Sequence, residues 1–97
     1  MISQKKSWEI KRVANSAHKY LNRLDIKTQE NILIKMERLE YDPYVGNIKK
    51  VEGKKDIYRL RVDDYRIYYR LQPRIQTIEI LLINHKSGIK DKAIQRL

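Results

Sequence analysis

The apolar positions of this chain follow two periods in succession, and the period changes near Asp42-Pro43. Before this point apolar residues recur every three or four positions, which is the spacing of a helix. After it they alternate with polar residues, which is typical of strands. No internal repeat, linker or low-complexity segment interrupts the pattern, so it predicts a single domain over residues 1–97.

The first half predicts a short strand and a helical hairpin. Trp8 and Ile10 alternate with charged residues, which indicates the strand. One apolar stripe then marks a first helix: Ala14, Ala17, Leu21 and Leu24. A second helix is expected to begin near Asp25 or Thr28, since either side chain can cap it. It should end at 41–43, because the residue before proline disfavours helix. Its inner face would be Ile32, Met36 and Leu39.

The second half predicts three strands, at 57–62, 65–71 and 75–83, and a short helix at 90–97. Asp63-Asp64 forms a two-residue turn between the first two strands, and residues 72–74 form the next turn. Residues 80–83 are apolar on both faces, as in a central strand. The order is β-α-α-β-β-β, an α+β fold in which a helical hairpin packs on one face of a small, mainly antiparallel sheet.

A two-residue turn at 63–64 fixes the register of the hairpin, so that Arg61 faces Arg66. Period-two alternation then gives one face for the core: Tyr58, Leu60, Val62, Tyr65, Ile67, Tyr69 and Leu71. The other face is Arg59, Arg61, Arg66, Tyr68 and Arg70. Like charges directly opposite each other are destabilising. Folding gives no reason for this arrangement, whereas phosphate binding does, because the guanidinium fork matches phosphate oxygens. The alternative is a solvated face that Glu79 or Asp56 neutralises in part.

Charge and composition narrow the function. The net charge is +10, from 22 basic and 12 acidic residues, which favours a polyanionic partner such as nucleic acid or the ribosome. Acidic proteins and anionic lipid surfaces fit the charge as well. The absence of cysteine excludes disulfides and thiolate metal sites. No His/Asp/Glu cluster has metal-site spacing, so we expect no metal or cofactor. No segment resembles a membrane span or signal peptide, and we expect a cytoplasmic protein.

Two stretches of the chain resemble a known family. Val51-Glu52-Gly53 followed by the residues from Tyr58 to Tyr69, and then Ile83-Asn84-His85-Lys86, resemble the central and C-terminal motifs of the RelE/ParE toxin superfamily. The resemblance extends over nearly the whole chain and implies a microbial-ribonuclease-like fold. It also implies the toxin of a type II toxin-antitoxin system, neutralised by a cognate antitoxin and able to form a hetero-oligomer with it on operator DNA.

Two activities occur in this superfamily. RelE-like members are endoribonucleases that cut mRNA in the ribosomal A site without a metal, by attack of a 2′-hydroxyl on the adjacent phosphate. ParE-like members poison DNA gyrase without catalysis of their own. The chain keeps most of the basic positions of the ribonucleases, so the resemblance favours an mRNA interferase that acts on the ribosome and mRNA. Gyrase poisoning remains the alternative, and a domain with no toxicity is a third.

The resemblance also suggests site residues. Arg59, Arg61, Arg66 and Lys86 match basic positions that hold the scissile phosphate and stabilise its developing charge. Arginine does not deprotonate, so His85 is the candidate general base; alternatively it ends the strand with a hydrogen bond. Residues 87–92 contain no tyrosine where active relatives have one, and Lys90 stands nearest that position. The expected RNA contacts are Tyr68, Arg70 and Lys90. Near Gly53, Glu52 and Asp56 either transfer protons or pair with lysines.

Overall fold

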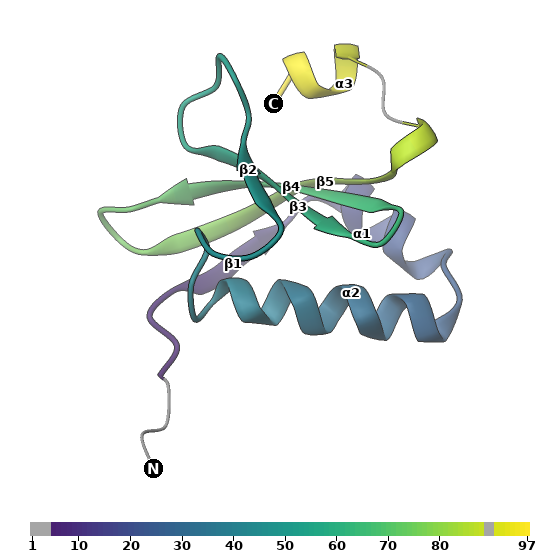
Figure 1. The fold of residues 1–97 in the computed structure, drawn as a ribbon, viewed down its shortest axis with the longest axis horizontal. Helices are drawn as coiled ribbons and strands as arrows, with labels where there is room; N and C mark the ends of the chain where they lie inside the picture. The colour runs from purple at the N-terminus through teal and green to yellow at the C-terminus, as the bar shows by residue number, and fades with distance from the viewer. Residues whose placement is uncertain (1–4, 89–90) are drawn as a thin grey trace.

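The computed structural model describes residues 5–88 and 91–97, and it has a five-stranded sheet with helices on both faces (Figure 1). In chain order the elements are β1 (Glu9–Val13), α1 (Asn15–Asn22), α2 (Ile26–Leu39), β2 (Ile48–Lys50), β3 (Ile57–Val62), β4 (Tyr65–Gln72), β5 (Thr77–His85), the 3-10 turn η1 (Lys86–Gly88) and α3 (Asp91–Gln95). The predicted α+β fold with a helical hairpin on the sheet is confirmed. The sequence did not predict the short strand β2.

The strands lie in the order β1-β5-β4-β3-β2. β1 runs parallel to β5, and the other three pairings are antiparallel. β5 therefore lies inside the sheet, in agreement with its apolar stretch at residues 80–83. It begins at Thr77, two residues later than predicted. Ile75 consequently belongs to the β4–β5 turn and is 65% exposed, because the turn is longer than the one expected at 72–74.

The helical hairpin covers one face of the sheet (Figure 1). Asp25 is the N-cap of α2, and its side chain accepts hydrogen bonds from the Thr28 backbone N–H and hydroxyl. The bond from the Thr28 hydroxyl has the larger effect and the bond from the Thr28 backbone N–H the smaller, and both lower the pKa of the Asp25 carboxyl. The predicted inner residues within the two helices are buried: Ala17, Leu21, Ile32, Met36 and Leu39. Ala14 and Leu24, also predicted for the first stripe, flank α1 and are half-buried. Within the described ranges, no helix is long and apolar enough to cross a membrane.

The opposite face of the sheet is only partly covered, and α3 lies over it (Figure 1). The Lys54 ammonium, in the loop between β2 and β3, donates a hydrogen bond to the Gln95 carbonyl oxygen of α3. Ile94 of α3 lines a small hollow together with Tyr68 of β4. The C-terminal helix thus shields one part of this face and leaves the part next to the β3–β4 turn open.

Candidate anion-binding site

Four basic side chains share the open part of the second face. The predicted register is confirmed, since Arg61 pairs with Arg66 and Arg59 pairs with Tyr68. β2 adds a residue to this face, because Lys49 lies opposite Arg59. Directly paired residues point to the same side of a sheet. We call Lys49, Arg59, Arg61 and Arg66 the basic face.

The basic face surrounds a shallow hollow of about 220 Å³. Its lining residues are Gly46, Asn47, Ile48, Lys49, Arg59, Arg61 and Arg66, without a carboxylate among them. Among the residues that the structure describes, none of the four basic side chains forms an ion pair. Their mutual repulsion is therefore not compensated within this part of the protein. A bound anion with several oxygens would relieve it.

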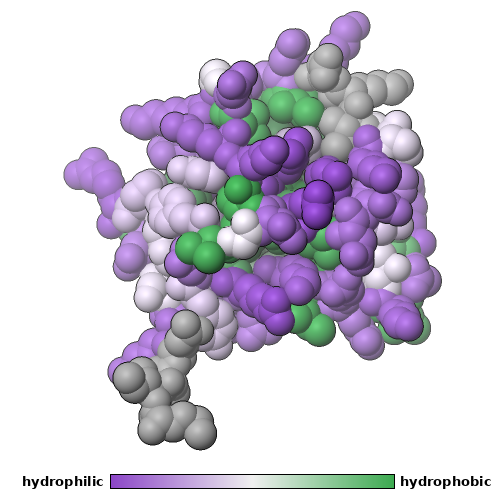
Figure 2. Space-filling model, in the orientation of Figure 1, coloured by the Kyte–Doolittle hydropathy of each residue, from purple (hydrophilic) through white to green (hydrophobic). Residues whose placement is uncertain are grey.

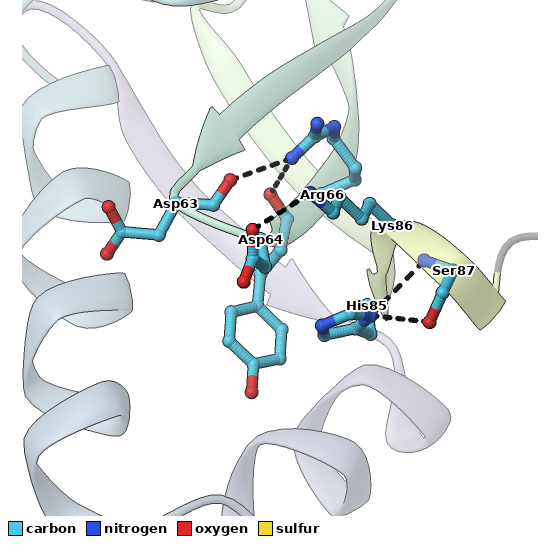
Figure 3. A network of polar contacts seen from close by, with 7 residues as sticks. Asp63, Asp64, Arg66, His85, Lys86 and Ser87 are labelled. Carbon is cyan, nitrogen blue, oxygen red and sulfur yellow. Dashed lines mark hydrogen bonds and ion pairs between the residues drawn. The ribbon is translucent and has the colours of Figure 1, made fainter.

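The backbone of the β3–β4 turn fixes the direction of Arg66. Its Nη1 donates to the carbonyl oxygens of Asp63 and Tyr65, at 3.0 Å in each case (Figure 3). Asp63 adopts a left-handed φ of 51°, which aspartate tolerates better than most residues. Guanidinium has five N–H donors. The turn uses one nitrogen, so Nε and Nη2 remain for an anion, and the group is held in place before the anion arrives.

Lys86 lies where β5 ends and is tied to the same turn. Its backbone N–H donates to the Asp64 carbonyl oxygen at 2.7 Å, and its ammonium lies 3.3 Å from an Asp64 carboxylate oxygen (Figure 3). Both side chains are more than half exposed, so this ion pair is weak and an anion can compete for the lysine. The structure thus brings Lys86 to the turn that also positions Arg66.

His85 lies on the other face of the sheet. It pairs with Tyr65, and the two rings pack edge-on at 5.3 Å between centroids. Tyr65 in turn contacts Tyr20 of α1, whereas Arg66 pairs with Asn84. His85 and Tyr65 therefore point toward the helical hairpin. The structure does not bring His85 together with the arginines.

The hydrogen bonds of His85 also define its tautomer. Its Nδ1 accepts the backbone N–H of Ser87 at 3.2 Å and lies 2.7 Å from the Ser87 hydroxyl (Figure 3). Because Nδ1 accepts from an N–H, a neutral His85 has its proton on Nε2. In this arrangement the free nitrogen is a donor. For Nε2 to accept the proton of a 2′-hydroxyl, His85 would first have to change its tautomer and give up the hydrogen bond from the Ser87 backbone.

The expected stacking of a base on Tyr68 would require a change in its surroundings. Tyr68 is on the predicted face but is only 2% exposed. The alternation of residues along β4 predicted the face of Tyr68 correctly. It could not predict that α3 lies next to Tyr68 on that face. Ile94 of α3 and Tyr68 line the same hollow on this face.

The other expected RNA contacts lie apart from the basic face or outside the described residues. Arg70 is four residues from Arg66 along β4, roughly 13 Å at the usual rise of a strand. Its guanidinium lies 3.3 Å from a Glu79 carboxylate oxygen. At this position the alternative prediction, in which Glu79 neutralises part of the charged face, is confirmed. Lys90 lies outside the described residues. Sequence reasoning missed Lys49, and its signal was the pair of lysines at 49–50, which is too short to indicate a strand.

The described residues contain no group of three or more His, Cys, Asp or Glu side chains that could hold a metal ion.

Comparison with known proteins defines the family. Residues 9–89 match the family model described as the ParE toxin of type II toxin-antitoxin systems, parDE. The match covers most of the chain, and the chain therefore belongs to this family. It is a toxin of the RelE/ParE superfamily of type II toxin-antitoxin systems. A search of curated proteins finds no match.

Solved structures share the fold at low sequence identity. The archaeal RelE–RelB complex from Pyrococcus horikoshii OT3 matches with a TM-score of 0.71 and 24% identity, over 88% of this chain and 100% of that one. The isolated E. coli RelE toxin matches with a TM-score of 0.69 and 16% identity, over 92% and 96%. The YoeB/ParE toxin from Agrobacterium tumefaciens matches with a TM-score of 0.65 and 16% identity, over 80% and 96%. These likenesses confirm the α+β toxin fold.

Proposed function

We propose that this toxin is an endoribonuclease that cleaves mRNA in the A site of the ribosome. The observation that carries the proposal is the basic face, where Arg61 lies directly opposite Arg66 and neither has a carboxylate partner among the described side chains. Such a pair costs stability unless an anion joins it, by roughly a few tenths of a kcal/mol. A phosphodiester is an anion of suitable size and oxygen geometry.

The chemistry requires stabilisation of a phosphate whose charge grows. The 2′-oxygen attacks phosphorus, the bond from phosphorus to the 5′-oxygen breaks, and the products are a cyclic phosphate and a 5′-hydroxyl. The 2′-hydroxyl proton goes to a base, and the 5′-oxygen receives a proton. Arg61 and the fixed Arg66 would hold the non-bridging oxygens, with Arg59 and Lys49 beside them. Preorganised positive charge acts most strongly where charge develops during the reaction.

The proton acceptor must come from a group other than His85 in the described conformation. Glu52 is a carboxylate at the edge of the site, since it lines a hollow with Lys49 and Arg59. The ribosome supplies further acceptors in the A site. We therefore propose that the toxin contributes mainly positioning and charge, and that RNA groups or Glu52 take the proton.

Replacing His85 with alanine tests this division of roles. We expect cleavage to stay within about threefold of wild type, because the ring lies on the helix side of the sheet. Stability should fall by about 1 kcal/mol, because alanine removes the edge-on packing against Tyr65. Cleavage rates at saturating ribosomes and urea unfolding measure the two effects. His18→Ala is the matched control, since His18 is exposed on α1. A hundredfold fall in rate from a folded H85A protein would place His85 in the chemistry.

A protein partner is part of the proposal. The Pyrococcus horikoshii structure is a RelE–RelB complex, and an E. coli relative has been solved as an intact RelBE toxin-antitoxin complex. We propose that a cognate antitoxin likewise binds this toxin and neutralises it, and that the pair assembles on operator DNA. The site of action would be the cytoplasm, where the ribosomes are.

Mapping of 5′ ends on a defined mRNA in a purified translation system tests the activity. The expected result is cuts within the A-site codon that require both ribosomes and the toxin. Arg61→Ala protein serves as the inactive control. Absence of cuts with folded wild-type protein would reject the ribonuclease.

Gyrase poisoning is the second candidate, because the matching family model is named for ParE and parDE. A DNA-cleavage assay with purified gyrase separates the two. Linear DNA that accumulates with wild-type toxin, in the absence of A-site cuts, would favour the gyrase target.

A further inference from the structure

We propose that the RNA-binding surface continues around the β2 edge of the sheet onto α2, where Lys35 and Arg38 bind a further phosphate of the RNA. The proposal deepens the proposed function and rests on RNA as the ligand of the basic face. It concerns affinity for RNA, and it assigns no chemical step to these two residues.

Two hollows meet at the edge of the sheet. One is the hollow of the basic face, and the other, of about 180 Å³, lies between the end of α2 and β3. Residues 46–48 and Arg61 line both of them, so the hollows adjoin across a single stretch of chain. A polyanion bound at Arg61 therefore has to pass only this stretch of chain to reach the second hollow. Lys35 and Arg38 form its α2 wall.

The second hollow has a net positive lining. Its charged residues are Lys35, Arg38, Arg61 and Asp42. Asp42 accepts the backbone N–H of Tyr44 at 3.0 Å, and within the described parts of the chain neither Lys35 nor Arg38 forms an ion pair. The two cations are three residues apart and so lie on one flank of the helix. Arg38 also complements the dipole at the C-terminus of α2, but this role does not extend to Lys35 one turn earlier.

The surroundings favour a nucleic acid over an acidic protein. Protein interfaces centre on apolar anchors. Ile26 and Leu33 of α2 project from nearly the opposite side of the helix, by the usual 100° per residue. Ile34, which is also exposed, lies four residues before Arg38 but does not line the hollow. The apolar lining residues Leu39 and Leu60 are buried, which leaves Val45 as the exposed apolar member. Figure 2 shows mainly hydrophilic side chains over β2 and α2, with small apolar spots between them.

Salt-dependent binding of RNA tests the proposal. The probe is a fluorescently labelled single-stranded uridine oligonucleotide, titrated with full-length protein at several KCl concentrations and followed by anisotropy. The variant is Lys35→Gln with Arg38→Gln, which removes two charges and keeps helix-forming side chains. The matched control is Lys55→Gln with Arg74→Gln. Both control residues are exposed and line a hollow at the far end of β4. The control also removes two positive charges, so the net charge of the two variants is the same.

We expect K35Q/R38Q to bind RNA about tenfold more weakly, and the slope of log affinity against log salt to fall by about 0.7 for each phosphate that the variant no longer neutralises. The control should change both quantities much less. Equal affinity and slope for K35Q/R38Q and the control would overturn the proposal, as would failure of wild-type protein to bind the oligonucleotide. Unchanged RNA binding with weakened binding of an acidic antitoxin would assign this flank to a protein instead. If RNA binds as expected but A-site cleavage is absent, the proposed function fails and the surface stands.

Discussion

Alanine at both Arg61 and Arg66 should abolish growth arrest and lower the rate of A-site cleavage by at least about a hundredfold. Each guanidinium would stabilise the developing charge of the phosphate, and removal of one preorganised donor typically costs 10²–10³ in rate. Arg66 is held by two turn carbonyls at 3.0 Å, so its loss removes a group that water does not replace in the same geometry. Induction of the variant in cells and cleavage in the purified translation system measure the effect.

The same variants must be shown to fold. Arg61→Ala removes one partner of a like-charged pair, so its unfolding free energy should be unchanged or higher by roughly a few tenths of a kcal/mol. Alanine at Lys55 and Arg74 is the control for the removal of charge, since both residues lie away from the basic face. Growth arrest that persists in folded R61A/R66A protein would remove the proposed site.

Tyr69 is expected to be the most sensitive position of the core. Its side chain is fully buried, its ring stacks on Tyr58 at 5.9 Å between centroids, and its hydroxyl donates to the Pro43 carbonyl oxygen at 2.7 Å. Tyr69→Ala should destabilise the fold by about 3–5 kcal/mol, as for other large aromatic deletions. Tyr69→Phe should cost about 1–2 kcal/mol, because it leaves the buried Pro43 carbonyl without its donor. Urea unfolding at neutral pH measures both.

The pH dependence of stability provides a second test of Tyr69. Burial, and then the neighbouring Tyr58, raise the pKa of its phenol above the ordinary value near 10. The buried phenol of Tyr69 therefore makes its full contribution to the free energy of unfolding below about pH 10. This contribution falls as the pH rises further, because the phenol then loses its proton readily only in the unfolded chain. Tyr69→Phe should make the alkaline loss of stability less steep. Tyr41→Phe is the control, because Tyr41 is exposed. Equal stability and equal alkaline slopes for wild type and Y69F would show that the buried hydroxyl contributes nothing.

The sequence predicted local structure well where one period dominated. The apolar stripes of α1 and α2 gave the correct buried faces, and a two-residue turn at 63–64 gave the correct register of β3 and β4. It did not give β2, because three residues do not establish alternation. It placed the start of the last strand too early, since Ile75 is apolar but belongs to the turn. Apolar character marks strands in general and cannot by itself exclude an exposed turn residue.

The candidate site divides in the same way. Alternation placed Arg59, Arg61 and Arg66 on one face, and the structure confirms that placement. The end of the last strand was harder to predict. His85 and Lys86 are adjacent in sequence and were expected to act together, yet β5 ends at His85 and Lys86 begins the 3-10 turn η1. Pairing with Tyr65 turns His85 toward α1, and the hydrogen bond from the Lys86 backbone N–H to the Asp64 carbonyl oxygen holds Lys86 at the turn that positions Arg66.

The sequence by itself determined the fold class, the helical hairpin, the register of β3 and β4, and the row of arginines on the outer face of that pair. These features depend on short-range periodicity and on turn length, which neighbouring residues fix. Only the tertiary structure decided which part of the outer face is open. The covering of Tyr68 by α3, the arrival of Lys49 on β2, and the separation of His85 from the arginines depend on contacts between segments far apart in the chain, and no local period encodes such contacts.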